Sequence, residues 1–148
     1  MAGFIFRGPE DLKQVERDTT TGVPAGGVAV GDVLYLSAGN IDYQLGSGTT
    51  AFDFHKKLVV TRVYGTADVE GIVVNPNQLW EVQSANNTTG THDGDRMALT
   101  DQNTVNNSAT DQSGSIAVVV QRGVIGAAAD KRILVSFINC SGIDPDRV

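Results

Sequence analysis

Short runs of β-branched and aromatic residues, separated by Gly, Asn, Asp or Pro, recur along this chain and limit the folds open to it. Each run has the length of a strand and is too short for a stable isolated helix. The segments between the runs contain no amphipathic helical pattern, which disfavours a βαβ fold. The 148 residues suit one hydrophobic core. We predict an all-β fold, a small β-barrel or β-tulip-like domain over residues 25–148. Strands are expected at residues 28–37, 58–64, 70–74, 78–83, 115–122 and 132–138, with a bend or bulge at Gly31.

The first part of the chain, residues 1–24, has a different pattern. Pro9 and the acidic residues after it predict a short helix over residues 9–17, whose apolar face holds only Leu12 and Val15. So small an apolar face cannot anchor a helix by itself. We therefore predict an extended N-terminal arm that is ordered either by a partner or by the rest of the domain.

The apolar residues of this arm are the candidate contact residues. Phe4 and Phe6 lie outside the predicted strands of the barrel, and aromatic side chains in a terminal segment usually need a docking groove. We predict that Phe4, Ile5, Phe6 and Arg7 contact another subunit.

Two other segments lack a clear strand pattern. Residues 84–114 are rich in Asn, Asp, Thr and Ser, and predict a long, protruding hairpin loop held by these side chains or by a neighbouring chain. The small-residue link 123–130 predicts a tight crossover packed against the core. Trp80, the chain's one tryptophan, is interpreted as a core residue.

The sequence offers little for catalysis or for a cofactor. His92, Asp93 and Asp95 could supply metal ligands, but they match no complete motif and are better interpreted as a solvated Asp-Gly turn. Neither His55 nor His92 lies near a nucleophile elbow. The single cysteine, Cys140, is interpreted as a small buried or half-buried side chain. We predict that the chain is not an enzyme and binds no metal or cofactor.

Charge and hydropathy restrict the partners. The net charge of −6 opposes phosphate binding, and Lys56 and Lys57 are interpreted as solvated residues at a strand end, so nucleic acid is not expected as a partner. The longest apolar run, residues 116–120, is too short to cross a bilayer, and the N-terminus does not resemble a secretion signal. These features predict a soluble chain made inside the cell, without a membrane partner.

Residues 27–39 and 123–137 resemble segments of small structural proteins of tailed bacteriophages, and the most similar class is the capsid decoration, or cement, proteins. The resemblance implies a β-barrel or β-tulip on the outer surface of the virion capsid, made in the cytoplasm of the bacterial host. It also implies a homo-oligomer, with a trimer favoured over a dimer, whose terminal arm bridges adjacent subunits of the major capsid protein. The expected function is thus to decorate and stabilise the capsid.

Two other functions remain open at this point. A carbohydrate- or receptor-binding β-domain of a virion fibre or tail adaptor would need its aromatic residues, Trp80, Tyr35, Tyr43 and Tyr64, exposed on one surface. A hydrolase or metalloenzyme would depend on His92, Asp93 and Asp95.

Overall fold

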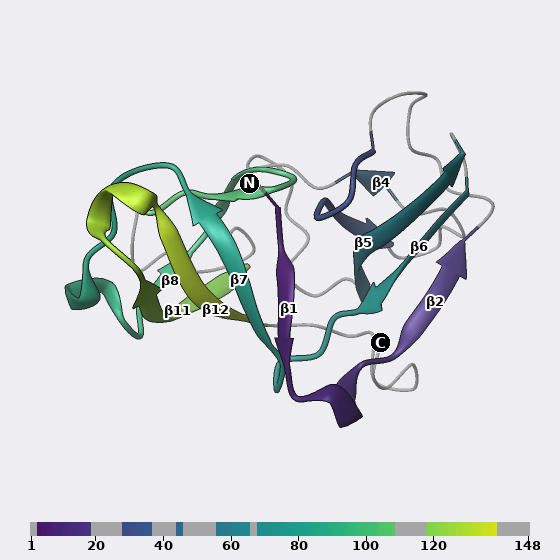
Figure 1. Cartoon of the computed structure of the whole chain (residues 1–148), viewed down its shortest axis with the longest axis horizontal. Helices are drawn as coiled ribbons and strands as arrows, with labels where there is room; N and C mark the ends of the chain where they lie inside the picture. Colours follow the sequence, from purple (N-terminus) through teal and green to yellow (C-terminus); the bar gives the residue numbers. More distant parts are fainter. Residues whose placement is uncertain are drawn as a thin grey trace.

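The chain folds into an all-β domain with a nearly closed, barrel-shaped sheet, which confirms the predicted fold class (Figure 1). The computed structural model describes residues 3–18, 28–36, 44–45, 56–65, 68–108 and 118–138. Within these ranges the helical segments are the short 3-10 turns η1 (Glu10–Leu12), η2 (Gly90–His92) and η4 (Ala128–Asp130), and none is long and apolar enough to cross a membrane. Predictions for Tyr43, His55, Cys140 and residues 19–24 and 109–114 fall outside the described residues.

The larger sheet, here called sheet A, is built around strand β7. Its strand order is β8-β11-β12-β7-β10-β9, and β1 pairs with β7 beside this path. Strand β7 is antiparallel to β1 and β12 and parallel to β10. The strands are β1 (Ile5–Gly8), β7 (Leu79–Ser84), β8 (Arg96–Met97), β9 (Leu99–Asp101), β10 (Thr104–Val105), β11 (Val119–Ile125) and β12 (Arg132–Phe137).

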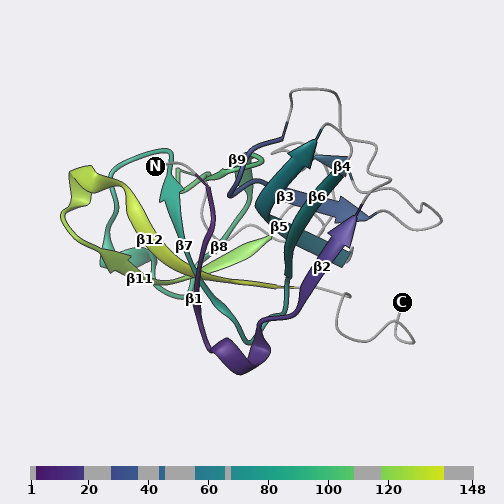
Figure 2. The same ribbon diagram turned by 45° about the vertical axis from the view of Figure 1, so that its right-hand side comes forward.

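The smaller sheet, sheet B, has the order β2-β6-β5-β3-β4, with neighbours antiparallel throughout. Figure 2 shows β2, β6, β5 and β3 side by side. Its strands are β2 (Val15–Asp18), β3 (Val33–Leu36), β4 (Gln44–Leu45), β5 (Lys56–Gly65) and β6 (Asp68–Val73). The predicted strands at residues 28–37, 58–64, 70–74, 78–83, 115–122 and 132–138 therefore all correspond to strands of the two sheets, with shifted ends.

Residues 3–18 belong to both sheets, because β1 pairs with β7 in sheet A and β2 pairs with β6 in sheet B. The described part of the predicted arm is thus ordered by the domain itself. The predicted helix over residues 9–17 is wrong, because only η1 is helical and β2 begins at Val15. Pairing with β6 satisfies the backbone of this segment, whereas a helix with two apolar residues would have had little to bury.

A glycine contact joins the N-terminus to the start of sheet B. The Phe4 N–H donates to the Gly31 carbonyl at 2.8 Å, and the Gly3 N–H donates to the Asn103 carbonyl at 2.9 Å. A Cβ atom on Gly31 would lie 2.9 Å from the Gly3 Cα atom, and Gly31 has a φ of +95°. Only glycine fits a backbone this close in that conformation. The predicted bend at Gly31 is confirmed.

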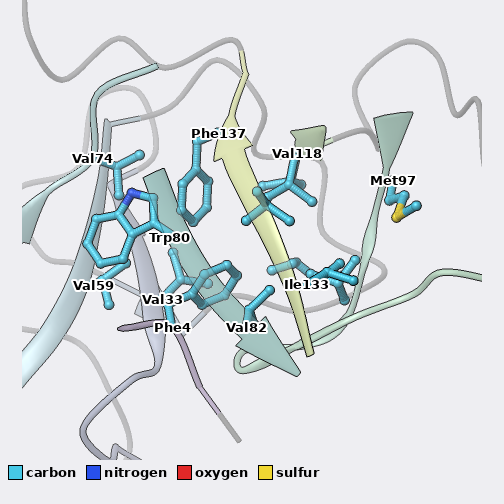
Figure 3. Packing of buried hydrophobic residues seen from close by; sticks show 14 of the residues in the cluster. Phe4, Val33, Val59, Val74, Trp80, Val82, Met97, Val118, Ile133 and Phe137 are labelled. Carbon is cyan, nitrogen blue, oxygen red and sulfur yellow. The ribbon is translucent and has the colours of Figure 1, made fainter. Parts of the chain in front are cut away.

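The core lies between the two sheets and is centred on Trp80, whose exposed fraction is 0%. The Trp80 ring packs edge-on against Phe4 and Phe137, with ring centroids 6.5 and 6.0 Å away. Figure 3 shows these rings together with Val33 and Val59 of sheet B. The interpretation of Trp80 as a core residue is confirmed.

Residues 84–108 do not form a protruding loop, so that prediction is wrong for the described part of the segment. They fold into η2, β8, β9 and β10 and bury Met97, Leu99 and Val105 in the core. The polar side chains hold the backbone as expected, since the Asn107 side chain accepts from the Asn86 N–H and donates to the Asn86 and Asn87 carbonyls.

Two smaller predictions are also wrong. The link at residues 123–130 is not a crossover, because β11 and β12 are adjacent antiparallel strands and the link closes their hairpin, with exposed alanines at its tip. Lys57 is not solvated, because its exposed fraction is 0%. It shares a face with Val59 two positions away, and that face packs into the core.

Candidate interaction surface

The residues predicted to contact another subunit lie on opposite faces of strand β1. Side chains alternate along a strand, and Phe4 and Phe6 point into the core, whereas Ile5 and Arg7 point outward. Phe4 is 3% exposed, and the Phe6 ring lies 5.3 Å from the Trp80 ring. The expectation that these two aromatics seek a partner's groove is therefore wrong, since their groove is the core of their own domain. Ile5 and Arg7 remain candidates.

The register of sheet A places other residues on the same side as Ile5 and Arg7. Ile5 lies opposite Glu81, and Glu81 lies opposite Leu134, so the three side chains form a row across β1, β7 and β12. Leu79 and Arg132 stand two residues from Glu81 and Leu134 and share their face. We call this surface the outer face of sheet A, and it consists of Ile5, Arg7, Leu79, Glu81, Arg132 and Leu134.

An ion cluster occupies the middle of the outer face. The Arg7 side chain donates to Glu81 Oε1 through Nε, at 2.9 Å, and through Nη2. On the other side, Arg132 Nε donates to Glu81 Oε2 at 2.9 Å. Burial by itself would raise the pKa of Glu81, but the hydrogen bonds and charges of Arg7 and Arg132 outweigh it and lower this pKa below its usual value. Glu81 is therefore a carboxylate at neutral pH.

The charge of this cluster is opposite in sign to that of the chain. The two guanidinium groups share one carboxylate, so the cluster carries a net positive charge on a protein whose net charge is −6. The side chain of Arg7 is 50% exposed and that of Arg132 14% exposed, so Arg7 is the arginine that a partner can reach. Arginines held in place beside apolar side chains are common in protein interfaces and can pair with a partner's carboxylates.

The sequence indicates only part of this surface. Ile5 and Arg7 were among the predicted contact residues, whereas Leu79, Glu81, Arg132 and Leu134 were not. Two of the missing residues could have been predicted from strand alternation, because Leu79 and Glu81 must point outward if Trp80 points inward. The pairing of β7 with β1 and β12 could not be found from spacing.

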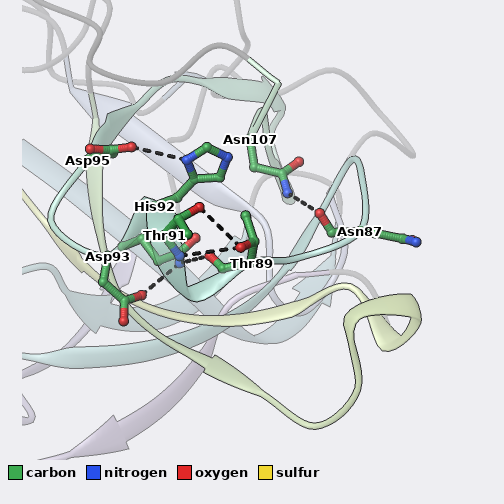
Figure 4. A network of polar contacts seen from close by, with 8 residues as sticks. Asn87, Thr89, Thr91, His92, Asp93, Asp95 and Asn107 are labelled. Carbon is green, nitrogen blue, oxygen red and sulfur yellow. Dashed lines mark hydrogen bonds and ion pairs between the residues drawn. The ribbon is translucent and has the colours of Figure 1, made fainter.

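The second candidate cluster, His92, Asp93 and Asp95, maintains the local fold (Figure 4). The Gln121 side chain donates to Asp93 Oδ1 at 2.8 Å and to the Thr89 carbonyl at 3.0 Å. His92 Nδ1 lies 3.1 Å from Asp95 Oδ2. No group of three or more His, Cys, Asp or Glu side chains is placed to hold a metal ion in the part of the chain that the structure describes.

The aromatic residues of this alternative that the structure describes do not form a platform for sugars. Trp80 and Tyr35 are buried, with exposed fractions of 0% and 9%, whereas Tyr64 is 39% exposed at the far end of sheet B. A stacked sugar needs an accessible ring face, which buried rings do not provide. No observation on the described residues therefore favours the carbohydrate-binding alternative.

Comparison with known proteins identifies no relative: no family model matches the chain, and no curated protein or solved structure matches it. The outer face of sheet A and the sequence resemblance are therefore the basis for inferring a function.

Proposed function

We propose that this chain is a structural protein of a tailed-bacteriophage virion, which binds the outside of the capsid and stabilises it by bridging subunits of the major capsid protein. It acts by binding and catalyses no reaction. A protein that binds only the assembled shell stabilises that shell by its binding free energy, and many copies on one particle multiply the effect.

The observation that carries this proposal is the outer face of sheet A. Three adjacent strands, β1, β7 and β12, present Ile5 and Leu134 beside the Arg7–Glu81–Arg132 cluster. Its side chains are held by neighbouring strands and by ion pairs, so little conformational freedom is lost when a partner covers them. The resemblance of residues 27–39 and 123–137 to capsid decoration proteins supplies the class of partner. The segment at residues 123–137 includes the last three residues of β11 and all of β12, which carries two residues of this face.

A binding experiment with purified empty shells tests the proposal. The shells are assembled from the major capsid protein of the phage that encodes this chain, and bound protein is measured by co-sedimentation over a range of concentrations. The double variant Ile5→Asp/Arg7→Glu should bind at least about tenfold more weakly, because it places two carboxylates beside Glu81 and removes the exposed cation. Failure of the unmodified protein to bind these shells would contradict the proposal.

A matched control separates the outer face from net charge. The double variant Val30→Asp/Arg96→Glu makes the same two kinds of substitution, and so the same change of net charge, at exposed residues outside the outer face. It should bind the shells like the unmodified protein. Thermal unfolding of every variant checks that the domain remains folded, and native mass spectrometry of the free protein tests the proposed trimer against a dimer or a monomer.

A further inference from the structure

Among the described strands β2 is an edge strand of sheet B that pairs only with β6, and its Val15 and Arg17 side chains are about half exposed. The Val73 N–H donates to the Gln14 carbonyl at 2.8 Å, and Val15, next along the strand, lies opposite Ile72. Inward and outward backbone groups alternate along an antiparallel pair. The N–H and C=O groups of Val15 and Arg17 therefore point away from β6, where an extended chain could pair with them.

Two cross-strand rows of side chains end at this edge. The first row is apolar and consists of Val59, Ile72 and Val15. Its first two members are buried, with exposed fractions of 0% and 1%, whereas Val15 is 52% exposed. The apolar row is thus left uncovered at its last member.

The second row is charged, and its signs alternate across the sheet. It consists of Arg62, Glu70 and Arg17, with Arg17 at the open edge. Opposite charges facing one another on neighbouring strands are stabilising, and like charges are destabilising. A fourth strand would therefore continue the row with a carboxylate opposite Arg17.

The Arg17 side chain is already held in position for such a partner. Its Nε and Nη2 atoms donate to the Asp68 carboxylate at 2.9 and 2.8 Å, and its guanidinium lies 3.9 Å from the centre of the Tyr64 ring. A guanidinium has five N–H donors, so others can bond to a further carboxylate. Because the group is fixed beforehand, pairing with it costs little conformational entropy.

We propose that an extended segment of the major capsid protein adds to β2 as an antiparallel strand, giving this protein a second contact surface besides the outer face of sheet A. The segment places an acidic residue opposite Arg17 and an apolar residue opposite Val15. Read from its N-terminus, it has the pattern acidic, any residue, apolar. The identity of the partner rests on the proposed function, whereas the pattern rests on the two rows alone.

A second copy of this chain does not fit the edge. Two copies of β2 would pair antiparallel about a two-fold axis. Residues directly opposite one another would then have their side chains on the same side of the sheet, so Arg17 could only lie opposite a residue an even number of positions away. Arg17 would then face Lys13, Val15 or another Arg17, depending on the register. None of these residues continues the charge row, and two of them oppose it.

Binding of two short synthetic peptides tests the pattern without the capsid. One peptide is Ser-Thr-Glu-Lys-Val-Thr-Ser, and its control, Ser-Thr-Lys-Glu-Val-Thr-Ser, has the same composition with the two charges exchanged. Titrated into isotope-labelled full-length protein, the first peptide should shift the NMR signals of the Val15 and Arg17 amides and bind about three- to tenfold more tightly than the control. Equal binding by the two peptides, or unmoved signals at both amides, would overturn the inference.

A proline variant tests the same edge on the capsid. Val15→Pro removes the outward N–H of residue 15, and an edge strand tolerates this change because that N–H does not pair with β6. The control Val15→Thr keeps the N–H. Val15→Pro should bind the first peptide and the shells at least about tenfold more weakly than Val15→Thr. If the shells bind both variants equally, the capsid does not pair with β2, and the inference fails while the proposed function stands. If the shells do not bind even the unmodified protein, the proposed function and the capsid as partner fail, and the peptides still decide the pattern.

Discussion

Replacing Phe4 tests whether the N-terminus is part of the core. Phe4 is 3% exposed, and its ring lies 5.0 Å from that of Phe137 and 6.5 Å from that of Trp80. Truncating a fully buried phenylalanine to alanine costs about 3–5 kcal/mol, because the transfer free energy of the ring is lost and a cavity remains. Aromatic neighbours place this residue in the upper part of that range, since paired rings contribute about 0.5–1.5 kcal/mol beyond their buried area. We therefore expect Phe4→Ala to lower the free energy of unfolding by about 4 kcal/mol.

Urea unfolding followed by tryptophan fluorescence measures this loss, because the single tryptophan is in the same cluster. With a slope of about 2 kcal/mol per molar urea, the transition midpoint should fall by about 2 M. The control Ile5→Ala changes the adjacent, outward-facing residue and should cost less than about 1 kcal/mol. If Phe4→Ala shifted the midpoint no more than Ile5→Ala, the aromatic ring would not be in the core, and the reasoning would be refuted.

Three further substitutions, the first with a matched glycine control, probe other parts of the fold. Gly31→Ala should lower the free energy of unfolding by about 2–3 kcal/mol, because Gly31 has a φ of +95° and an added Cβ would meet Gly3. In the control Gly123→Ala the added Cβ has no atom within 4 Å, so stability should change by less than about 1 kcal/mol. The urea midpoints of the two variants measure the difference. Glu81→Gln should lower stability by about 1–2 kcal/mol at neutral pH. Because the pKa of Glu81 is lowered in the folded protein, its carboxylate stabilises the fold above its usual pKa and loses this effect as the pH falls through the lowered pKa. The cost of Glu81→Gln should therefore shrink as the solution is made acidic, and a constant cost would contradict the ion cluster. Gln121→Leu should cost about 1–3 kcal/mol and speed hydrogen exchange in η2, because the Thr89 carbonyl and Asp93 lose their donor.

The strands of the domain body could be predicted because their signal is local. Runs such as residues 58–64 and 132–138 are rich in β-branched residues, which favour a strand wherever it is placed in a sheet. The turn at Gly31 was also visible, since a glycine between two apolar runs indicates a bend.

The N-terminal segment could not be predicted in the same way because its partners are distant. Phe-Ile-Phe-Arg alternates between inward and outward residues, but the strand that pairs with it begins at Leu79. Local helix signals after Pro9 indicated the wrong structure, because pairing with β6 outweighs the propensity of a few residues. The same reason explains residues 84–108, where buried residues such as Met97 and Val105 are too widely spaced among polar ones to show a period.

Only the residues of the candidate surface that lie on strand β1 could be predicted from the sequence. Ile5 and Arg7 were chosen for their chemistry and do point outward, but Glu81 and Arg132 join them through the register of three strands. Once one buried residue of a strand is known, alternation along the sequence tells which of its other side chains point outward. Which outward side chains of different strands become neighbours depends on the strand order and register.

The ring contact between Phe4 and Phe137 also has a consequence for how the protein is made. Bringing together groups about 130 residues apart costs about 4 kcal/mol of chain entropy, and this cost precedes the contacts that offset it. On the ribosome, β1 emerges before β7 and must remain unpaired until β7 has been synthesised, and the aromatic neighbour of Phe4 in β12 comes later still. Phe4 and Phe6 therefore stay exposed on the growing chain until β7 and β12 have been made, and a label joined directly to Gly3 would disturb this late closure.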